Sequence, residues 1–148
     1  MSSRILVAFD ESPQARAALR HALERYPDAE VVVVHVTDPG EWVYPDELGG
    51  TYYAESAFEA AQETAESLLE SAAEIAAAAG REVTTVAEVG PTAGTIVDCA
   101  EDREVDHIVM GSHGRRGLSR FLLGSVAERV ARRAPVSVTM IREPATGN

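Results

Sequence analysis

A group of glycine and serine residues follows an apolar segment in the last third of the chain. Gly111, Gly114 and Gly117 permit close backbone approach, and Gly124 with Ser125 precedes a helix-forming segment. Such a backbone can direct amide N–H groups and a serine hydroxyl at an anion, beside the partial positive charge of a helix N-terminus. These residues predict a phosphate-binding loop, and the alternative is a mobile surface loop.

The same segment is basic within an acidic protein. The formal net charge is -11, yet residues 111–133 hold six of the thirteen arginines and a single acid, Glu128. Arg115, Arg116 and Arg120 would raise the positive potential over a screening length of roughly 10 Å. We therefore expect arginine side chains to assist anion binding in this loop.

Other phosphate-binding motifs are absent. A P-loop ends in Lys followed by Ser or Thr, and the chain has no lysine. The dinucleotide fingerprint G-x-G-x-x-G would follow the first strand, where this sequence reads FDESP at 9–13. A receiver domain is another α/β fold, and Asp10 with Glu11 would supply part of the acidic pair that such a domain needs. Like the P-loop, however, a receiver domain requires a lysine.

Composition limits the class of protein. We expect one soluble, cytoplasmic domain over residues 1–143 and a flexible tail over 144–148, because the sequence has neither a signal peptide nor a long apolar run. Cys99, the only cysteine, excludes multi-cysteine metal clusters and is expected to be a small buried hydrophobe. The acidity argues against nucleic-acid binding. A salt-adapted cytoplasm and a GC-rich genome would each explain arginine without lysine.

Hydrophobic patterns predict an alternating α/β chain. Strands are expected at 5–9, 30–36, 81–89, 106–111 and 135–141, and helices from Pro13 behind a Ser12 cap and over 56–79, 95–101 and 125–134. Residues 38–53 contain two prolines and three glycines, so a long irregular connection is expected there. This alternation predicts right-handed crossovers and a mostly parallel, doubly wound sheet.

Ligands of such sheets bind beyond the carboxyl ends of the strands, where the strand order reverses. Asp10, Val36, Met110 and Gly111 occupy such ends in the predicted sheet. Asp10 could instead cap the following helix. His35 is expected to be structural, whereas His113 could donate to a phosphate or face solvent.

The spacing Gly111-x-x-Gly114, nine residues, then Gly124-Ser125 resembles the G-2x-G-9x-G-[ST] motif of the nucleotide-binding universal stress protein family. The segments VAFDES, VVHVTD, GPTAGTIV, VDHIVMGSHG and RRAPVSVTMIR are similar to the family's blocks in the same order. The resemblance covers nearly the whole chain and leaves only the 38–56 loop unconstrained. It implies a five-stranded parallel sheet in the order 3-2-1-4-5, with ATP across the ends of the first, second and fourth strands.

The resemblance also implies roles for particular residues. Asp10 would hold the ribose or adenine, Val36 would meet the adenine edge, and Met110 with Gly111 would flank the sugar. Gly114, Gly124, Ser125 and the Val126 amide would hold the phosphates, with Mg²⁺ bridging phosphate oxygens. The full set of predicted binding residues is Ala8, Phe9, Asp10, Val36, Met110, Gly111, His113, Gly114, Arg115, Arg116, Gly124, Ser125 and Val126.

A binding module is favoured over an enzyme. G-x-S-x-G is absent, and no acid is positioned to complete a triad with Ser112 or Ser125 and His113. No base for γ-phosphate hydrolysis is evident, so any ATPase rate is expected to be slow. The alternative is a metabolic enzyme that adenylates its substrate. Residues 136–141 read VSVTMI and follow a proline, which predicts an edge strand and a homodimer paired through it.

Overall fold

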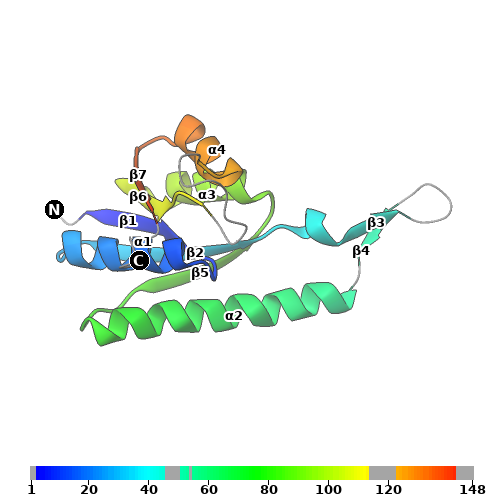
Figure 1. Cartoon of the computed structure of the whole chain (residues 1–148), viewed down its shortest axis with the longest axis horizontal. Helices are drawn as coiled ribbons and strands as arrows, with labels where there is room; N and C mark the ends of the chain where they lie inside the picture. Colours follow the sequence, from blue (N-terminus) through cyan, green and yellow to red (C-terminus); the bar gives the residue numbers. More distant parts are fainter. Residues whose placement is uncertain (1–2, 46–50, 54, 114–122, 143–148) are drawn as a thin grey trace, which may run out of the picture.

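The sheet has the predicted topology. A computed structural model describes residues 3–45, 51–53, 55–113 and 123–142. Five parallel strands pair in the order β5-β2-β1-β6-β7 (Figure 1). They are β1 (Arg4–Ala8), β2 (Glu30–Thr37), β5 (Thr84–Val89), β6 (His107–Gly111) and β7 (Ser137–Ile141). Counted along the chain, these five strands follow the order 3-2-1-4-5, so the predicted doubly wound fold is confirmed.

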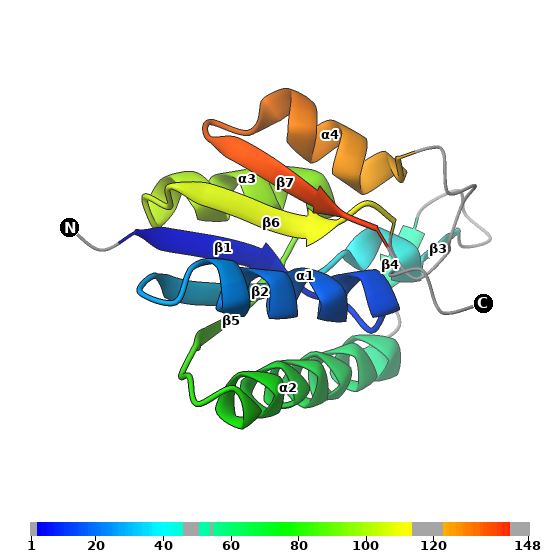
Figure 2. The same ribbon diagram turned by 60° about the vertical axis from the view of Figure 1, so that its left-hand side comes forward.

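Helices cover both faces of the sheet, as Figure 2 shows. They are α1 (Pro13–Arg25), α2 (Glu55–Ala78), α3 (Thr92–Asp102) and α4 (Ser125–Arg133). Helices α1 and α2 pack on one face against side chains such as Val7 and Val33, and α3 and α4 pack on the other against Leu6 and Ile108. The central strands are apolar on both faces because each face meets a helical layer.

Local sequence signals explain where three helices begin or end. Ser12 caps α1 by accepting a hydrogen bond from the Ala15 amide at 3.1 Å, and Pro13 follows, as predicted. Helix α2 ends before Gly80, whose φ of +74° favours glycine. Helix α3 begins at Thr92, three residues before its predicted start, because the extended Pro91 already serves as its N-cap.

The connection after β2 is more regular than predicted. It contains a 3-10 helix (Pro39–Trp42) and an antiparallel pair formed by β3 (Val43–Pro45) and β4 (Thr51–Tyr53). The prediction of an entirely irregular segment was therefore wrong for its described part. Valine and tyrosine favour extended structure, and the prolines and glycines of the segment hid that preference. Residues 46–50 and 54 lie outside the described residues.

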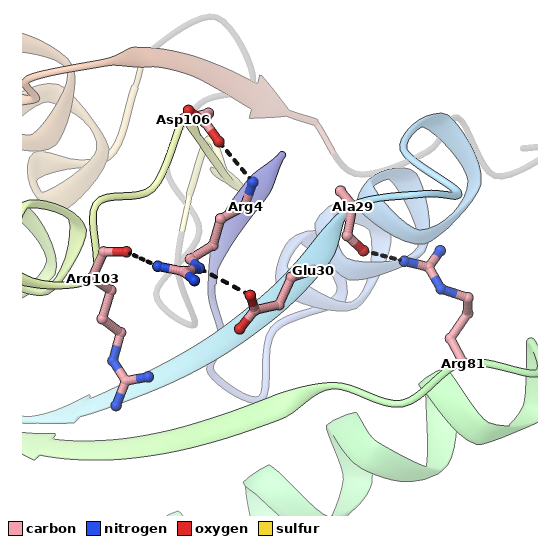
Figure 3. Close-up of polar contacts among 6 residues, drawn as sticks. All are labelled: Arg4, Ala29, Glu30, Arg81, Arg103 and Asp106. Carbon is pink, nitrogen blue, oxygen red and sulfur yellow. Dashed lines mark hydrogen bonds and ion pairs between the residues drawn. The ribbon is translucent and has the colours of Figure 1, made fainter. Parts of the chain in front are cut away.

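Arginine side chains join the elements at the amino ends of the strands (Figure 3). The Arg4 guanidinium pairs with Glu30 at 3.0 Å, and the Arg4 amide donates to the Asp106 carboxylate at 2.8 Å. Arg81 donates to the Ala29 carbonyl at 2.7 Å and to the Leu23 carbonyl at 2.9 Å. Strand β5 begins at Thr84, three residues after its predicted start, where its pairing with β2 begins opposite Val32. These contacts lie at the end of the sheet opposite the predicted ligand site.

Candidate functional site

A cleft of about 740 Å³ opens at the carboxyl ends of β1, β2 and β6. It lies where the strand order reverses between β1 and β6, as expected for ligand sites in doubly wound sheets. Ten predicted binding residues line it: Ala8, Phe9, Asp10, Val36, Met110, Gly111, His113, Gly124, Ser125 and Val126. Gly114, Arg115 and Arg116 lie outside the described residues. Residues from three strands, from helix α4 and from the adjoining turns thus meet around one cleft.

The turn after β1 is held by its own side chains. Asp10 Oδ1 accepts a hydrogen bond from the Ser12 amide at 2.8 Å, while Ser12 itself caps α1. The alternative that Asp10 is the helix cap is therefore wrong. His35 Nδ1 lies 2.8 Å from the Phe9 carbonyl oxygen, which agrees with the structural role expected for this histidine. This network fixes the carboxyl end of β1 at one wall of the cleft.

The turn after β6 is joined to three other elements. The Ser112 amide donates to the Ile141 carbonyl in β7, and the Gly124 amide donates to the Ser112 carbonyl, each at 2.8 Å. A Cβ added to Gly111 would lie 2.6 Å from Gln14 Cβ in α1, so a larger residue cannot fit there without movement. Gly124 is the N-cap of α4 and, having no side chain, makes no side-chain capping hydrogen bond. The first amides of α4 therefore begin beside Ser112, at the cleft.

His113 is buried rather than solvent-facing, so that alternative for it is wrong. Its exposed fraction is 7%, and Ser112 beside it is 4% exposed. Its Nδ1 lies 3.2 Å from Ser112 Oγ. Its Nε2 is buried and has no hydrogen-bond partner among the residues that the structure describes. The sequence could not show this burial, because it depends on distant elements that pack around the turn.

Helix α2 supplies one wall of the cleft that the sequence analysis missed. The lining residues from this helix are small or apolar: Ala57, Ala60, Ala61, Thr64 and Leu68. They repeat at helical spacing, beside a stripe of exposed glutamates at 59, 63, 66, 70 and 74. These glutamates form a solvent-exposed face of the helix. The helical pattern shows that α2 has an apolar face, but not that part of this face borders a ligand site.

The described part of the cleft is acidic on one side. Asp10, Glu11 and Asp38 line it, and no arginine does so within the described residues. Groups of three or more side chains suited to a metal ion are absent from the part of the chain that the structure describes. The same cleft is lined by His113 and by the first residues of α4, whose backbone amides can donate hydrogen bonds. Its described part thus combines carboxylates with amide and imidazole groups, which suits a ligand with one anionic end.

Two groups outside the cleft have shifted pKa values. Burial raises the pKa of the Cys99 thiol, which agrees with its expected role as a small buried hydrophobe. Burial, with a smaller contribution from His21, lowers the pKa of His107. Neither residue lines the cleft, so neither shift bears on its chemistry. No described helix is both long and apolar enough to cross a membrane.

The fold and the position of the cleft define an α/β domain of the doubly wound class with a cleft at its topological switch point. The family model described as the universal stress protein family matches residues 1–142. This chain belongs to the universal stress protein family.

Relatives agree over nearly the whole chain. Universal stress protein MJ0531 from Methanocaldococcus jannaschii is 35% identical over 144 residues, which cover 95% of this chain and 82% of the relative. Universal stress protein MJ0577 from the same organism is 32% identical over 155 residues, covering 96% of each protein.

The solved structure of MJ0577 has a TM-score of 0.82 and 30% identity and covers 99% of both chains. A universal stress protein in complex with cAMP has a TM-score of 0.68 and 22% identity, covers 96% of this chain and 98% of its own, and shows likeness of fold. These comparisons support the predicted stress-protein function and not the adenylating alternative.

Proposed function

We propose that this universal stress protein binds ATP in the cleft at the carboxyl ends of β1, β2 and β6 and acts as a nucleotide-responsive regulatory or protective module of the cytoplasm. The observation that carries the proposal is the meeting of Asp10, Val36 and the uncapped N-terminus of α4 around one cleft. A helix N-terminus is a favourable place for phosphate groups. The membership of this chain in the universal stress protein family is consistent with such a role.

The two sides of the cleft would hold the two ends of the nucleotide. Ala8, Phe9, Asp10 and Val36 would contact adenine and ribose at the acidic side. Met110 and Gly111 would flank the sugar. An uncharged base and sugar tolerate neighbouring carboxylates better than phosphates do, so this orientation avoids electrostatic repulsion.

The phosphates would lie along the turn after β6 and the first turn of α4. Gly124, Ser125 and the Val126 amide would donate to phosphate oxygens, with Gly114, Arg115 and Arg116 completing the loop. Mg²⁺ would bridge phosphate oxygens, because Mg²⁺ keeps several waters and is commonly held by substrate phosphates. The ion would also reduce repulsion between the ligand and the acidic residues of the cleft.

Calorimetry with ATP and AMP tests the phosphate assignment. We expect ATP to bind more tightly in the presence of Mg²⁺, because the β- and γ-phosphates gain donors that AMP cannot reach. Equal affinities would remove the phosphate role of the segment from 114 to 125. Mass spectrometry of gently denatured protein should in addition release intact ATP that was retained through purification.

A further inference from the structure

Among the described residues, two buried side-chain atoms have no hydrogen-bond partner, Gln14 Oε1 and His113 Nε2. Of these two residues, only His113 lines the cleft. Burying a polar group without a hydrogen-bond partner is unfavourable, because the group loses its contacts with water and gains none in return. More than nine-tenths of His113 is buried, so an occupant of the cleft is the partner that its Nε2 could gain.

The Ser112 hydroxyl can either donate to Nδ1 of His113 or accept from it, and this choice decides whether Nε2 donates or accepts. Ser112 Oγ lies 3.2 Å from Nδ1, and the Ser112 carbonyl accepts from the Gly124 amide that precedes α4. When the Ser112 hydroxyl donates to Nδ1, the ring proton resides on Nε2. The Nε2–H group of His113 and the first backbone amides of α4 would then belong to residues that line the same cleft. A set made only of donors is suited to an anionic oxygen.

We propose that His113 is the specificity-determining residue that selects phosphorylated over unphosphorylated ligands in this cleft. Ser112 holds the imidazole by donating to Nδ1, and Nε2–H donates to a phosphate oxygen of the bound nucleotide. This inference rests on the proposed function, since it uses the same cleft. It deepens that function by assigning selectivity for the phosphate to one buried N–H group.

Two substitutions of His113 distinguish the contributions of its two ring nitrogens to binding. The side-chain amide nitrogen of Gln reaches the region of Nε2 and keeps a donor there, whereas that of Asn reaches only the region of Nδ1. Calorimetry on the full chain would measure the affinities of the His113→Gln and His113→Asn variants for ATP and for adenosine. We expect His113→Asn to weaken ATP binding about 10- to 100-fold. The affinity for adenosine should stay within about twofold, because adenosine lacks the phosphate acceptor. His113→Gln should keep ATP within about fivefold of the unsubstituted chain.

The Ser112→Ala variant tests the role of the same His113 N–H group independently. Without the hydroxyl, the proton is no longer held on Nε2, so ATP should bind less tightly while adenosine is unaffected. Thermal unfolding of each variant establishes that the measurements compare folded proteins. A variant that fails to fold is replaced by the other two, which report on the same N–H group.

Several outcomes would overturn the inference. Equal losses of ATP and adenosine in His113→Asn would mean that His113 only shapes the cleft, and a loss confined to adenosine would mean that Nε2 accepts from a ribose hydroxyl. Equal ATP losses in the Gln and Asn variants, or none in Asn, would also contradict it. If the unsubstituted chain bound neither ligand, the proposed function would fail as well. Binding of ATP without the expected variant pattern rejects only the role of His113.

Discussion

At the scale of single residues, Gly124 combines an ordinary backbone with a position beside the proposed phosphate site. Its φ of -67° and ψ of 160° are accessible to any residue. Gly124→Val should therefore fold, while its branched side chain would enter the space assigned to phosphate. We expect the ATP affinity to fall at least 10-fold, roughly the value of one charge-assisted hydrogen bond, and the unfolding midpoint to fall modestly, because valine is a poorer N-cap residue than glycine.

Gly94 offers a matched control within another helix. A Cβ at Gly94 would meet no heavy atom nearer than 3.8 Å, the distance to the Arg133 guanidinium, so alanine fits there without strain. Gly94→Ala should leave ATP binding unchanged and raise the free energy of unfolding by about 0.4–1 kcal/mol. Normal ATP affinity in a folded Gly124→Val protein would refute the position assigned to the phosphates.

At the scale of elements, β6 and β7 are joined by a histidine whose protonation should affect stability. His107 Nε2 lies 2.6 Å from Thr139 Oγ1, and the ring is 5.8 Å from that of Tyr26. Burial is the main cause that lowers the pKa of His107 below the ordinary value of 6.5, with His21 contributing less. In the window below 6.5 the unfolded chain therefore binds a proton that the folded protein does not.

The free energy of unfolding should consequently decrease as the pH falls from 6.5 towards the lower pKa of His107 in the folded protein. Below that pKa the loss of stability due to His107 should be complete. Denaturant titrations between about pH 5 and 8 would compare the unsubstituted chain with His107→Gln. The variant should lose this part of the pH dependence. Parallel stability profiles for the two proteins across the whole range would contradict the expectation.

The elements differ in how far the sequence could predict them. Runs such as EVVVVHV and ILVAF predict buried strands, because β-branched and apolar residues without alternation suit a sheet covered on both faces. The β3–β4 pair was missed because proline and glycine dominate its local signal. The α2 wall of the cleft was missed for another reason: helical periodicity shows that a face is apolar but not what it borders. His113 was found as a candidate, whereas its burial depends on packing that no local pattern encodes.

At the scale of the whole molecule, the sheet has two edges with different chemistry. Strand β5 pairs only with β2 and carries Glu88 among mostly exposed residues, and a charge in an edge strand opposes pairing with another chain. Strand β7 pairs only with β6 and contains no charged residue. None of the described strands lies beside the main-chain groups on its outer side. We therefore propose that a homodimer forms through residues 136–141 rather than through β5.

Lysine substitutions at the two edges test this homodimer. Ser137 in β7 and Thr84 in β5 are both exposed, so each accepts lysine without disturbing the core. In a dimer paired through β7, Ser137→Lys brings two like charges to one interface, and dimerisation should weaken roughly 10-fold. Thr84→Lys adds the same charge at the other edge and should leave dimerisation unchanged. Sedimentation or light scattering over a range of concentrations measures both effects. A concentration-independent monomer for the unsubstituted chain would refute the dimer, and weakening by Thr84→Lys alone would move the interface to β5.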